Sequence, residues 1–218
     1  MYIHQLSKKH SVLHHFLSEI RDQSIQKDRM RFRRNIERIG EILTYEMSMS
    51  FSFSDKETIT PLGKKGCVEI SNKIVVCSIL RTGLPLHQGI INYLDGADCS
   101  FISAYRCHTS ETDFEIHVEY LASQDLDNKT LILADPMLAT GQSILATFDA
   151  LTKVGLPKEV HILSVIGARP GIAFLQKKLP KETHLWIGDI DAKLNEKGYI
   201  IPGLGDAGDL AFGEKLQK

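Results

Sequence analysis

The sequence predicts an α/β fold in which helices flank a mostly parallel central sheet. Apolar runs short enough for buried strands alternate with segments of helical periodicity, and this alternation is typical of parallel sheets. The clearest example is LILADPMLATGQS at residues 131–143, which passes from an apolar run through an acid and a proline into a helical segment. The 218 residues contain no linker, internal repeat or low-complexity segment, so we expect a single domain over residues 1–218.

The composition is that of an ordinary globular protein, with 43% hydrophobic residues and a formal net charge of −1. So neutral a chain lacks the basic character of nucleic-acid-binding proteins, and we expect no nucleic-acid partner. No apolar run reaches the ~20 residues of a membrane span, and the first residues lack the apolar core of a signal peptide. The absence of a C-x-x-C pair favours buried free thiols in a reducing cytoplasm for the four cysteines, Cys67, Cys77, Cys99 and Cys107.

The segment 1–24 is polar and contains two histidines at helical spacing. His10 and His14 would share one face of a helix, as would Leu13 and Leu17. A metal pair and a pair of surface histidines both fit this spacing. We favour surface histidines, because no third ligand lies nearby in the sequence.

Residues 27–49 form the clearest helix. Apolar residues recur every three or four positions and predict one buried stripe, made of Phe32, Ile36, Ile39, Leu43 and Met47. The first half carries five arginines, Arg29, Arg31, Arg33, Arg34 and Arg38. A nucleic-acid patch and the solvated face of an amphipathic helix both fit this cluster, and the solvated face is the commoner explanation.

The remaining elements follow from the same patterns. Residues 51–70 hold polar turns and predict a short antiparallel excursion from the main sheet. The expected strands are 73–80, 100–105, 114–120, 131–134, 160–167 and 184–187, and the expected helices are 84–94, 144–151 and 171–178. A polar stretch followed by an alternating one predicts a long hairpin at about 106–120 that could fold over a site.

The turn that follows the strand 131–134 has the layout of an anion site. Asp135 and Pro136 end the strand, and Ala139–Ser143 is small and hydroxyl-bearing before the next helix begins. Backbone N–H groups and the positive end of a helix dipole bind phosphate at such turns. An ordinary strand-to-helix turn capped by Thr140 or Ser143 fits the same residues. The spacing and the lysine of a Walker A loop are missing.

Two further loops carry candidate binding groups. Arg81 follows the strand 73–80, which places a cation at the sheet edge where ligands of parallel sheets bind. Near the carboxyl terminus, Gly203, Gly205 and Gly208 spell a literal G-x-G-x-x-G. A dinucleotide fingerprint needs a strand before it and a βαβ unit around it, and both are missing here. The glycines instead predict a tight loop whose exposed backbone can read the edge of a small flat ligand.

Three motifs resemble those of uracil phosphoribosyltransferases. They are ILR-x-G at 79–83, DPMLATG at 135–141 and YIIPGLGDAGD at 199–209, and R-F-R at 31–33 and L-T-Y-E at 43–46 also match. The resemblance extends from about Ser11 to Gly213. It implies a type I phosphoribosyltransferase-like fold with an antiparallel hairpin lid and a C-terminal base-binding hood at about 188–213.

In that family the enzyme transfers ribose 5-phosphate from 5-phosphoribosyl 1-diphosphate (PRPP) to N1 of uracil, in pyrimidine salvage, and forms UMP and diphosphate. The resemblance implies that Arg81 and Arg106 meet the diphosphate. It implies that Asp135 faces the ribose hydroxyls within a PRPP loop made of Asp135, Pro136, Met137, Leu138, Ala139, Thr140, Gly141, Gln142 and Ser143. It assigns uracil to Ile200, Gly205, Asp206 and Ala207. Asp206 would also approach PRPP, and catalysis would rest on Asp206, Arg106 and Asp135.

The resemblance further implies Mg²⁺ bound mainly through PRPP, with no dedicated metal ligands in the protein. It implies a cytoplasmic homodimer or homotetramer and raises GTP as an effector. Three segments depart from the family pattern: Gln142 replaces a glycine, Thr82 and Pro85 alter the arginine loop, and Cys107–Ser110 replaces acidic residues. The alternatives are a transferase for another base, or a PRPP- or nucleotide-sensing regulator on the same fold, RNA-binding through the arginine cluster.

Overall fold

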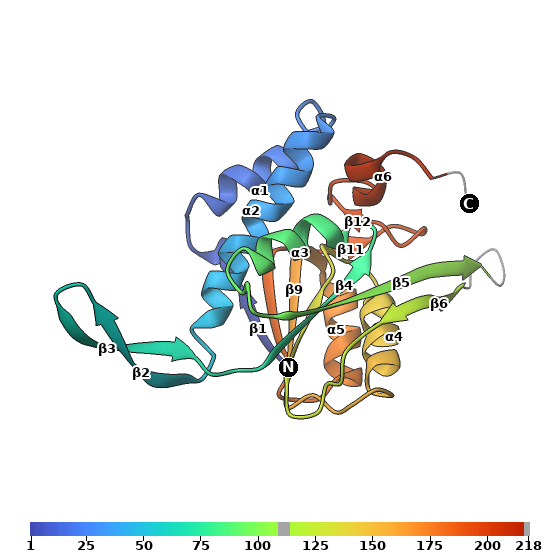
Figure 1. Ribbon diagram of the computed structural model, residues 1–218. Coiled ribbons are helices and arrows are strands. Elements are labelled where there is room, and N and C mark those ends of the chain that lie inside the picture. Colours follow the sequence, from blue (N-terminus) through green and yellow to red (C-terminus); the bar gives the residue numbers. More distant parts are fainter. Residues whose placement is uncertain (109–113, 216–218) are drawn as a thin grey trace.

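The computed structural model describes residues 1–108 and 114–215, without the side chains of residues 104–118 (Figure 1). Its main sheet has eight strands in the order β1-β10-β9-β7-β4-β5-β6, with β8 paired to β9. The strands are β1 (Tyr2–Gln5), β4 (Ile74–Leu80), β5 (Asp98–His108), β6 (Phe114–Ala122), β7 (Thr130–Ala134), β8 (Met137–Leu138), β9 (Glu159–Ala168) and β10 (His184–Asp191). All pair in parallel except β6, which runs antiparallel to β5. The predicted mostly parallel sheet is confirmed.

Helices cover both faces of this sheet (Figure 1). The helices are α1 (Leu13–Arg21), α2 (Arg29–Ser48), α3 (Gly83–Ile91), α4 (Gln142–Leu151), α5 (Arg169–Lys178) and α6 (Ala207–Phe212), with a short 3-10 turn η1 (Leu6–Lys8). Side chains of α1, α2 and α3 pack in one core layer, and those of α4 and α5 pack in another. Successive residues of β4 alternate between these layers, as the two-residue period of a strand requires, with Val76 in the first and Val75 and Cys77 in the second.

The predicted apolar stripe of α2 is confirmed. Phe32, Ile36, Ile39, Leu43 and Met47 are all buried. The carboxylate of Asp28 caps the helix by accepting a hydrogen bond from the Arg31 N–H. The helix therefore begins where a good capping residue precedes the periodic run, two residues later than the pattern predicted.

Residues 51–70 were predicted to form a short antiparallel excursion from the main sheet; the antiparallel pairing is confirmed, but the excursion is longer than predicted. They contain β2 (Phe53–Thr60) and β3 (Gly63–Ile70), which form a separate two-stranded sheet that projects from the body as an arm (Figure 1). A two-stranded ribbon with nothing packed on its faces leaves its side chains in solvent. Cys67 on β3 is exposed for this reason, so the expectation of buried thiols fails there, whereas Cys77 on β4 is buried.

The carboxyl-terminal segment forms a small hood beside the main sheet (Figure 1). It contains the antiparallel pair β11 (Lys193–Leu194) and β12 (Ile200–Ile201), followed by α6. Buried Ile200, Leu204 and Ala207 tie this hood into the core layer of α1, α2 and α3. The hood is thus anchored to the amino-terminal helices.

Candidate active site

The strand order places a ligand site between β4 and β7. From β4 the chain continues to β5 on one side, and it later returns to β7 on the other side of β4. Ligands of open parallel sheets bind where the strand order reverses in this way, beyond the carboxyl ends of the strands. Arg81 directly follows β4 and Asp135 directly follows β7. Two residues predicted from separate motifs therefore lie on neighbouring strand ends.

Local hydrogen bonds fix the loop that starts at Asp135. The Asp135 N–H donates to the Leu163 carbonyl at 3.1 Å, and the Ser164 hydroxyl donates to the Asp135 carbonyl. One carboxylate oxygen of Asp135 accepts from the Met137 N–H at 3.1 Å. Backbone and side chain of this acid are both oriented by their neighbours, which is the preorganisation that a binding group needs.

The turn before α4 rests directly on α5. A Cβ placed on Gly171 would lie 2.0 Å from the Ala139 carbonyl oxygen, and one placed on Gly141 would lie 2.8 Å from the Leu175 side chain. Gly141 also has a φ of +79°, which favours glycine. The turn therefore packs so closely on α5 that neither Gly141 nor Gly171 could carry a side chain without a shift of the backbone.

Gly141 is the N-cap of α4, so neither Thr140 nor Ser143 takes the capping position of the alternative interpretation. The Thr140 hydroxyl accepts a long hydrogen bond, 3.4 Å, from the Gln142 N–H. Among the described residues, the Gln142 Oε1 atom is buried and has no hydrogen-bond partner. A buried polar oxygen without a partner is uncommon and costly, so this oxygen can accept a hydrogen bond from a water molecule or a ligand.

The arginine loop meets both the Asp135 loop and the hood. A Cβ on Gly83 would lie 3.2 Å from the Ala134 carbonyl oxygen, so the first turn of α3 contacts the end of β7. Arg81 forms an ion pair with Asp209 of α6 at 3.2 Å and donates to the Gly213 carbonyl at 3.4 Å. The peptide bond before Arg81 is cis.

Pro85, which departs from the family pattern of the arginine loop, is compatible with the helix that follows this loop. Pro85 lies in the first turn of α3, where a missing N–H costs no helical hydrogen bond. Below the loop, the Ser78 hydroxyl and His87 Nδ1 are 2.8 Å apart in the core. Burial lowers the pKa of His87, so its ring is neutral at physiological pH.

The predicted base-binding residues surround the start of α6. Asp206 is the N-cap, and its Oδ1 atom accepts from the Asp209 N–H at 3.0 Å. Its Oδ2 atom lies 3.5 Å from the Tyr199 hydroxyl. Ile200 and Ala207 are buried, whereas Gly205 is exposed with a φ of +94°. The loop thus presents an apolar floor, a carboxylate and a glycine backbone together.

Arg106 lies on β5, and its side chain falls outside the described residues, as do the side chains of Cys107–Ser110. The backbone pairing of β5 with β6 confirms the antiparallel hairpin predicted at about 106–120. The lid role assigned to this hairpin and the diphosphate role assigned to Arg106 stay predictions.

Arg29, Arg31 and Arg34 of α2 are exposed, as expected for the solvated face of an amphipathic helix. The arginines of this helix also make contacts, both within α2 and with other elements. Arg33 donates to the Ala211 carbonyl and lies over the Phe212 ring, with 5.9 Å from its Cζ atom to the centroid. The other contacts are ion pairs of Arg31 with Glu19 and of Arg34 with Glu37, and Arg38 over the ring of Phe16. Arg33 supports α6, a role that no local sequence signal indicated.

Residues with metal-ligand chemistry are dispersed. In the described parts of the chain, no three His, Cys, Asp or Glu side chains are grouped so that they could hold a metal ion. His10 and His14 have ring centroids 5.2 Å apart near the start of α1. Within the same residues, no helix is both long and apolar enough to cross a membrane.

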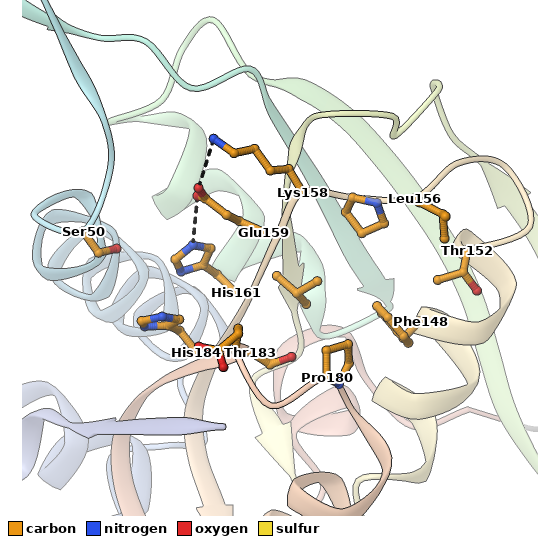
Figure 2. A pocket seen from close by; sticks show the side chains of 13 residues that line it. Ser50, Phe148, Thr152, Leu156, Lys158, Glu159, His161, Pro180, Thr183 and His184 are labelled. Carbon is orange, nitrogen blue, oxygen red and sulfur yellow. Dashed lines mark ion pairs between the residues drawn. The ribbon is translucent and has the colours of Figure 1, made fainter.

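A cavity of about 380 Å³ lies at the other end of the sheet, near the amino ends of β9 and β10 (Figure 2). Its walls include Phe148, Leu156 and Pro180 together with His161 and His184. It contains none of the residues predicted to bind substrate. The cavity is therefore separate from the site at the carboxyl ends of β4 and β7.

A mostly parallel sheet with an acidic loop and an arginine loop where its strand order reverses, and with a small hood beside it, has the architecture of type I phosphoribosyltransferases. A hypoxanthine phosphoribosyltransferase structure from Staphylococcus aureus shares the fold, with a TM-score of 0.50 and 14% identity over 73% of this chain and 74% of that one. Residues 7–214 match the family model of uracil phosphoribosyltransferase.

The chain belongs to the uracil phosphoribosyltransferase family. It is 46% identical to a uracil phosphoribosyltransferase of Porphyromonas gingivalis over 99% of this chain and 100% of that protein. The structure of the AQ2163 protein from Aquifex aeolicus superposes with a TM-score of 0.87, at 30% identity over 98% of this chain and 99% of that one.

Proposed function

We propose that this protein transfers the 5-phosphoribosyl group of PRPP to N1 of uracil and forms UMP and diphosphate. Family membership supports this reaction. The observation that carries it is the meeting of three loops: Arg81 contacts the hood through Asp209, and the helix after Arg81 contacts the end of β7, where Asp135 follows. One edge of the sheet thus offers groups for a sugar phosphate and for a base.

PRPP would occupy the loop from Asp135 to Ser143. We assign the ribose hydroxyls to the Asp135 carboxylate and the 5-phosphate to the turn Ala139–Ser143. The support for this assignment is the position of the turn at the start of α4, where backbone N–H groups and the helix dipole favour an anion. The Gln142 Oε1 atom, which has no partner, lies in the same loop, and we assign it as the acceptor of a hydrogen bond from a ribose hydroxyl of PRPP or from a water molecule bound with PRPP.

The bond between C1 of the ribose and the diphosphate breaks during the reaction. Positive charge develops on the ribose and negative charge on the leaving group. We assign the leaving diphosphate to Arg81 and Arg106, because a planar guanidinium can make paired hydrogen bonds to phosphate oxygens. No nucleophilic side chain is needed, so positioning and electrostatics supply the catalysis.

Mg²⁺ would enter the site with PRPP. The protein offers Asp135 and Asp206 as separate carboxylates at this edge, and oxygen ligands of this kind suit Mg²⁺. No dense carboxylate cage occurs in the described residues, which suits an ion held mainly by substrate phosphates. When bound, the ion would stabilise the charge that develops on the leaving oxygens.

Uracil would lie in the hood against Ile200, Gly205, Asp206 and Ala207. The exposed Gly205 backbone supplies hydrogen-bonding groups in fixed positions, and the buried Ile200 supplies an apolar surface. We assign Asp206 to both substrates, because it belongs to the base loop and lies near Arg81: a Cβ on Gly208 would meet Asp206 Oδ1 at 3.2 Å and Arg81 Nη2 at 3.4 Å. The hairpin at 106–120 would exclude water, and faster PRPP hydrolysis without uracil after its shortening would test that role.

We also propose that the protein is a cytoplasmic homo-oligomer. The exposed thiol of Cys67 and the free thiols of Cys77 and Cys99 suit a reducing compartment. The projecting arm β2–β3 exposes 80% of Ile59 and 100% of Leu62 to solvent, and exposed apolar side chains on a projecting element are typical of subunit contacts. A second copy of the chain is the partner that we assign to this arm.

The test is a direct assay of the purified protein. PRPP, Mg²⁺ and uracil should give UMP and diphosphate in equal amounts, and omission of uracil should abolish UMP. Hypoxanthine in place of uracil tests the base, and added GTP tests the effector. Absence of UMP while PRPP still binds would refute the transferase and favour a PRPP-sensing regulator.

A further inference from the structure

We propose that Arg21 is a positioning residue that holds the uracil loop in place. Arg21 ends α1 and lies outside every motif that links the chain to its family. Its Nη1 donates to the Asp191 carboxylate at 2.8 Å and to the Gly203 carbonyl at 3.0 Å. Its Nη2 donates to the Asp189 carboxylate at 2.9 Å. One guanidinium therefore joins α1, the end of β10 and the loop that leads to Gly205.

Both backbone polar groups of Gly203 are held by this cluster. Its carbonyl accepts from Arg21, and its N–H donates to Asp191 Oδ2 at 3.2 Å. Gly203 has a φ of +57°, and a Cβ there would lie 2.2 Å from the Ile200 carbonyl oxygen. The backbone conformation of Gly203 is therefore fixed by the hydrogen bonds of its carbonyl and its N–H, and Gly203 lies two residues before Gly205.

The ion pair with Asp191 is the more shielded half of the cluster. The exposed fractions of the Arg21 and Asp191 side chains are 20% and 8%, against 32% for Asp189. A shielded ion pair is weakly screened, and loss of one partner leaves the other charge buried without compensation. The loss of Arg21 would therefore force Asp191, and with it Gly203, to find a new arrangement.

Asp189 orients the guanidinium without touching the loop. It accepts from the Ser7 hydroxyl at 2.8 Å and from the Gln5 amide at 3.3 Å, both on the amino-terminal segment. Burial raises the pKa of Asp189, but the hydrogen bonds from Ser7 and the nearby Arg21 outweigh it, so the carboxyl stays ionised. Asp189 and Asp191 thus share one arginine, and only Asp191 also holds Gly203.

Because Arg21 holds Gly203 and Asp189 does not, Arg21→Gln and Asp189→Asn form a matched pair of variants. Because the inference rests on the proposed uracil role of the Gly205–Ala207 loop, the first measurement is steady-state kinetics with PRPP and uracil. Arg21→Gln should raise the KM for uracil at least about tenfold, since misplacing a binding loop by about 1 Å costs that much or more, and should change the KM for PRPP less than about twofold. Asp189→Asn should leave both KM values within about threefold.

A general loss of stability would give a different pattern. Equal rises in both KM values, or equal effects of Arg21→Gln and Asp189→Asn at matched thermal stability, would overturn the inference. If Arg21→Gln does not fold, Arg21→Lys serves instead, because it keeps the charge but lacks the planar fork whose two terminal nitrogens hold Gly203 with Asp191 on one side and Asp189 on the other. The same rise in the KM for uracil is then expected.

A second measurement does not depend on activity. Amide hydrogen exchange of residues 203–206 should be at least about tenfold faster in Arg21→Gln than in Asp189→Asn, because only the first variant frees the Gly203 carbonyl. Unchanged exchange would overturn the inference even in an active enzyme. If the wild-type protein forms no UMP, the proposed function fails, and the exchange result still decides whether Arg21 positions this loop.

Discussion

Acid should destabilise this protein through His161, which lines the cavity at the end of the sheet opposite the proposed active site (Figure 2). His161 is 3% exposed, and its Nδ1 atom accepts a hydrogen bond from the Trp186 indole N–H at 3.1 Å. Its ring centroid lies 5.2 Å from that of His184, whose own Nδ1 atom is 3.1 Å from His4 Nε2. Burial, and then the neighbouring His184 and His4, lower the pKa of His161 from 6.5 to about 4.

The two pKa values fix the sign and size of the effect. Between pH 6.5 and pH 4 the unfolded chain binds a proton at His161 that the folded protein does not bind. The stabilisation is therefore complete above pH 6.5 and is lost as the pH falls toward 4. For this pair of values the free energy of unfolding should fall by about 2 kcal/mol between pH 7 and pH 5 from His161 alone.

Urea unfolding of wild type and His161→Gln at pH 7 and pH 5 measures this loss. A glutamine oxygen can still accept from the Trp186 indole, so the variant removes the titration and keeps an acceptor. The difference between the two pH values should be about 2 kcal/mol smaller in the variant than in wild type. His10→Gln, at an exposed position before α1, is the control and should show the same difference as wild type. Equal pH dependence in wild type and His161→Gln would refute the reasoning.

Three further predictions concern the active site and the arm. Asp206→Asn should lower turnover at least about 100-fold without lowering thermal stability, because asparagine is also a good N-cap and only the charge is lost. Near-normal UMP formation would contradict the role of Asp206. Gly141→Ala should lower the free energy of unfolding by about 1–3 kcal/mol in urea, because its φ is +79° and the new methyl group would lie 2.8 Å from Leu175; wild-type stability would show that the turn is not tightly held. Ile59→Lys combined with Leu62→Lys should dissociate the oligomer in light-scattering measurements without lowering thermal stability, and a monomeric wild type would rule out the arm contact.

Elements with strong local patterns could be predicted from the sequence, and elements with weak ones could not. The stripe of α2 and the strand β7 follow from helical and apolar periodicity and are confirmed. β1 was missed, because its four residues, YIHQ, have no alternation and become a strand only by pairing with β10, about 180 residues away. The arm was underestimated for a similar reason: with no buried face, its strands carry no alternating pattern to detect.

The same distinction separates the groups proposed to bind substrate from the group proposed to support them. Arg81, Asp135 and Asp206 lie in short loops whose composition marks them as candidates, because a loop that binds a ligand needs particular residues close together in sequence. Arg21 has no such mark. Its partners, Asp189, Asp191 and Gly203, lie 168–182 residues further along the chain, and only the folded sheet brings them to the end of α1. The precision of the base loop therefore depends on an ion pair that can be found only in three dimensions, and a substitution remote from every motif should alter uracil binding.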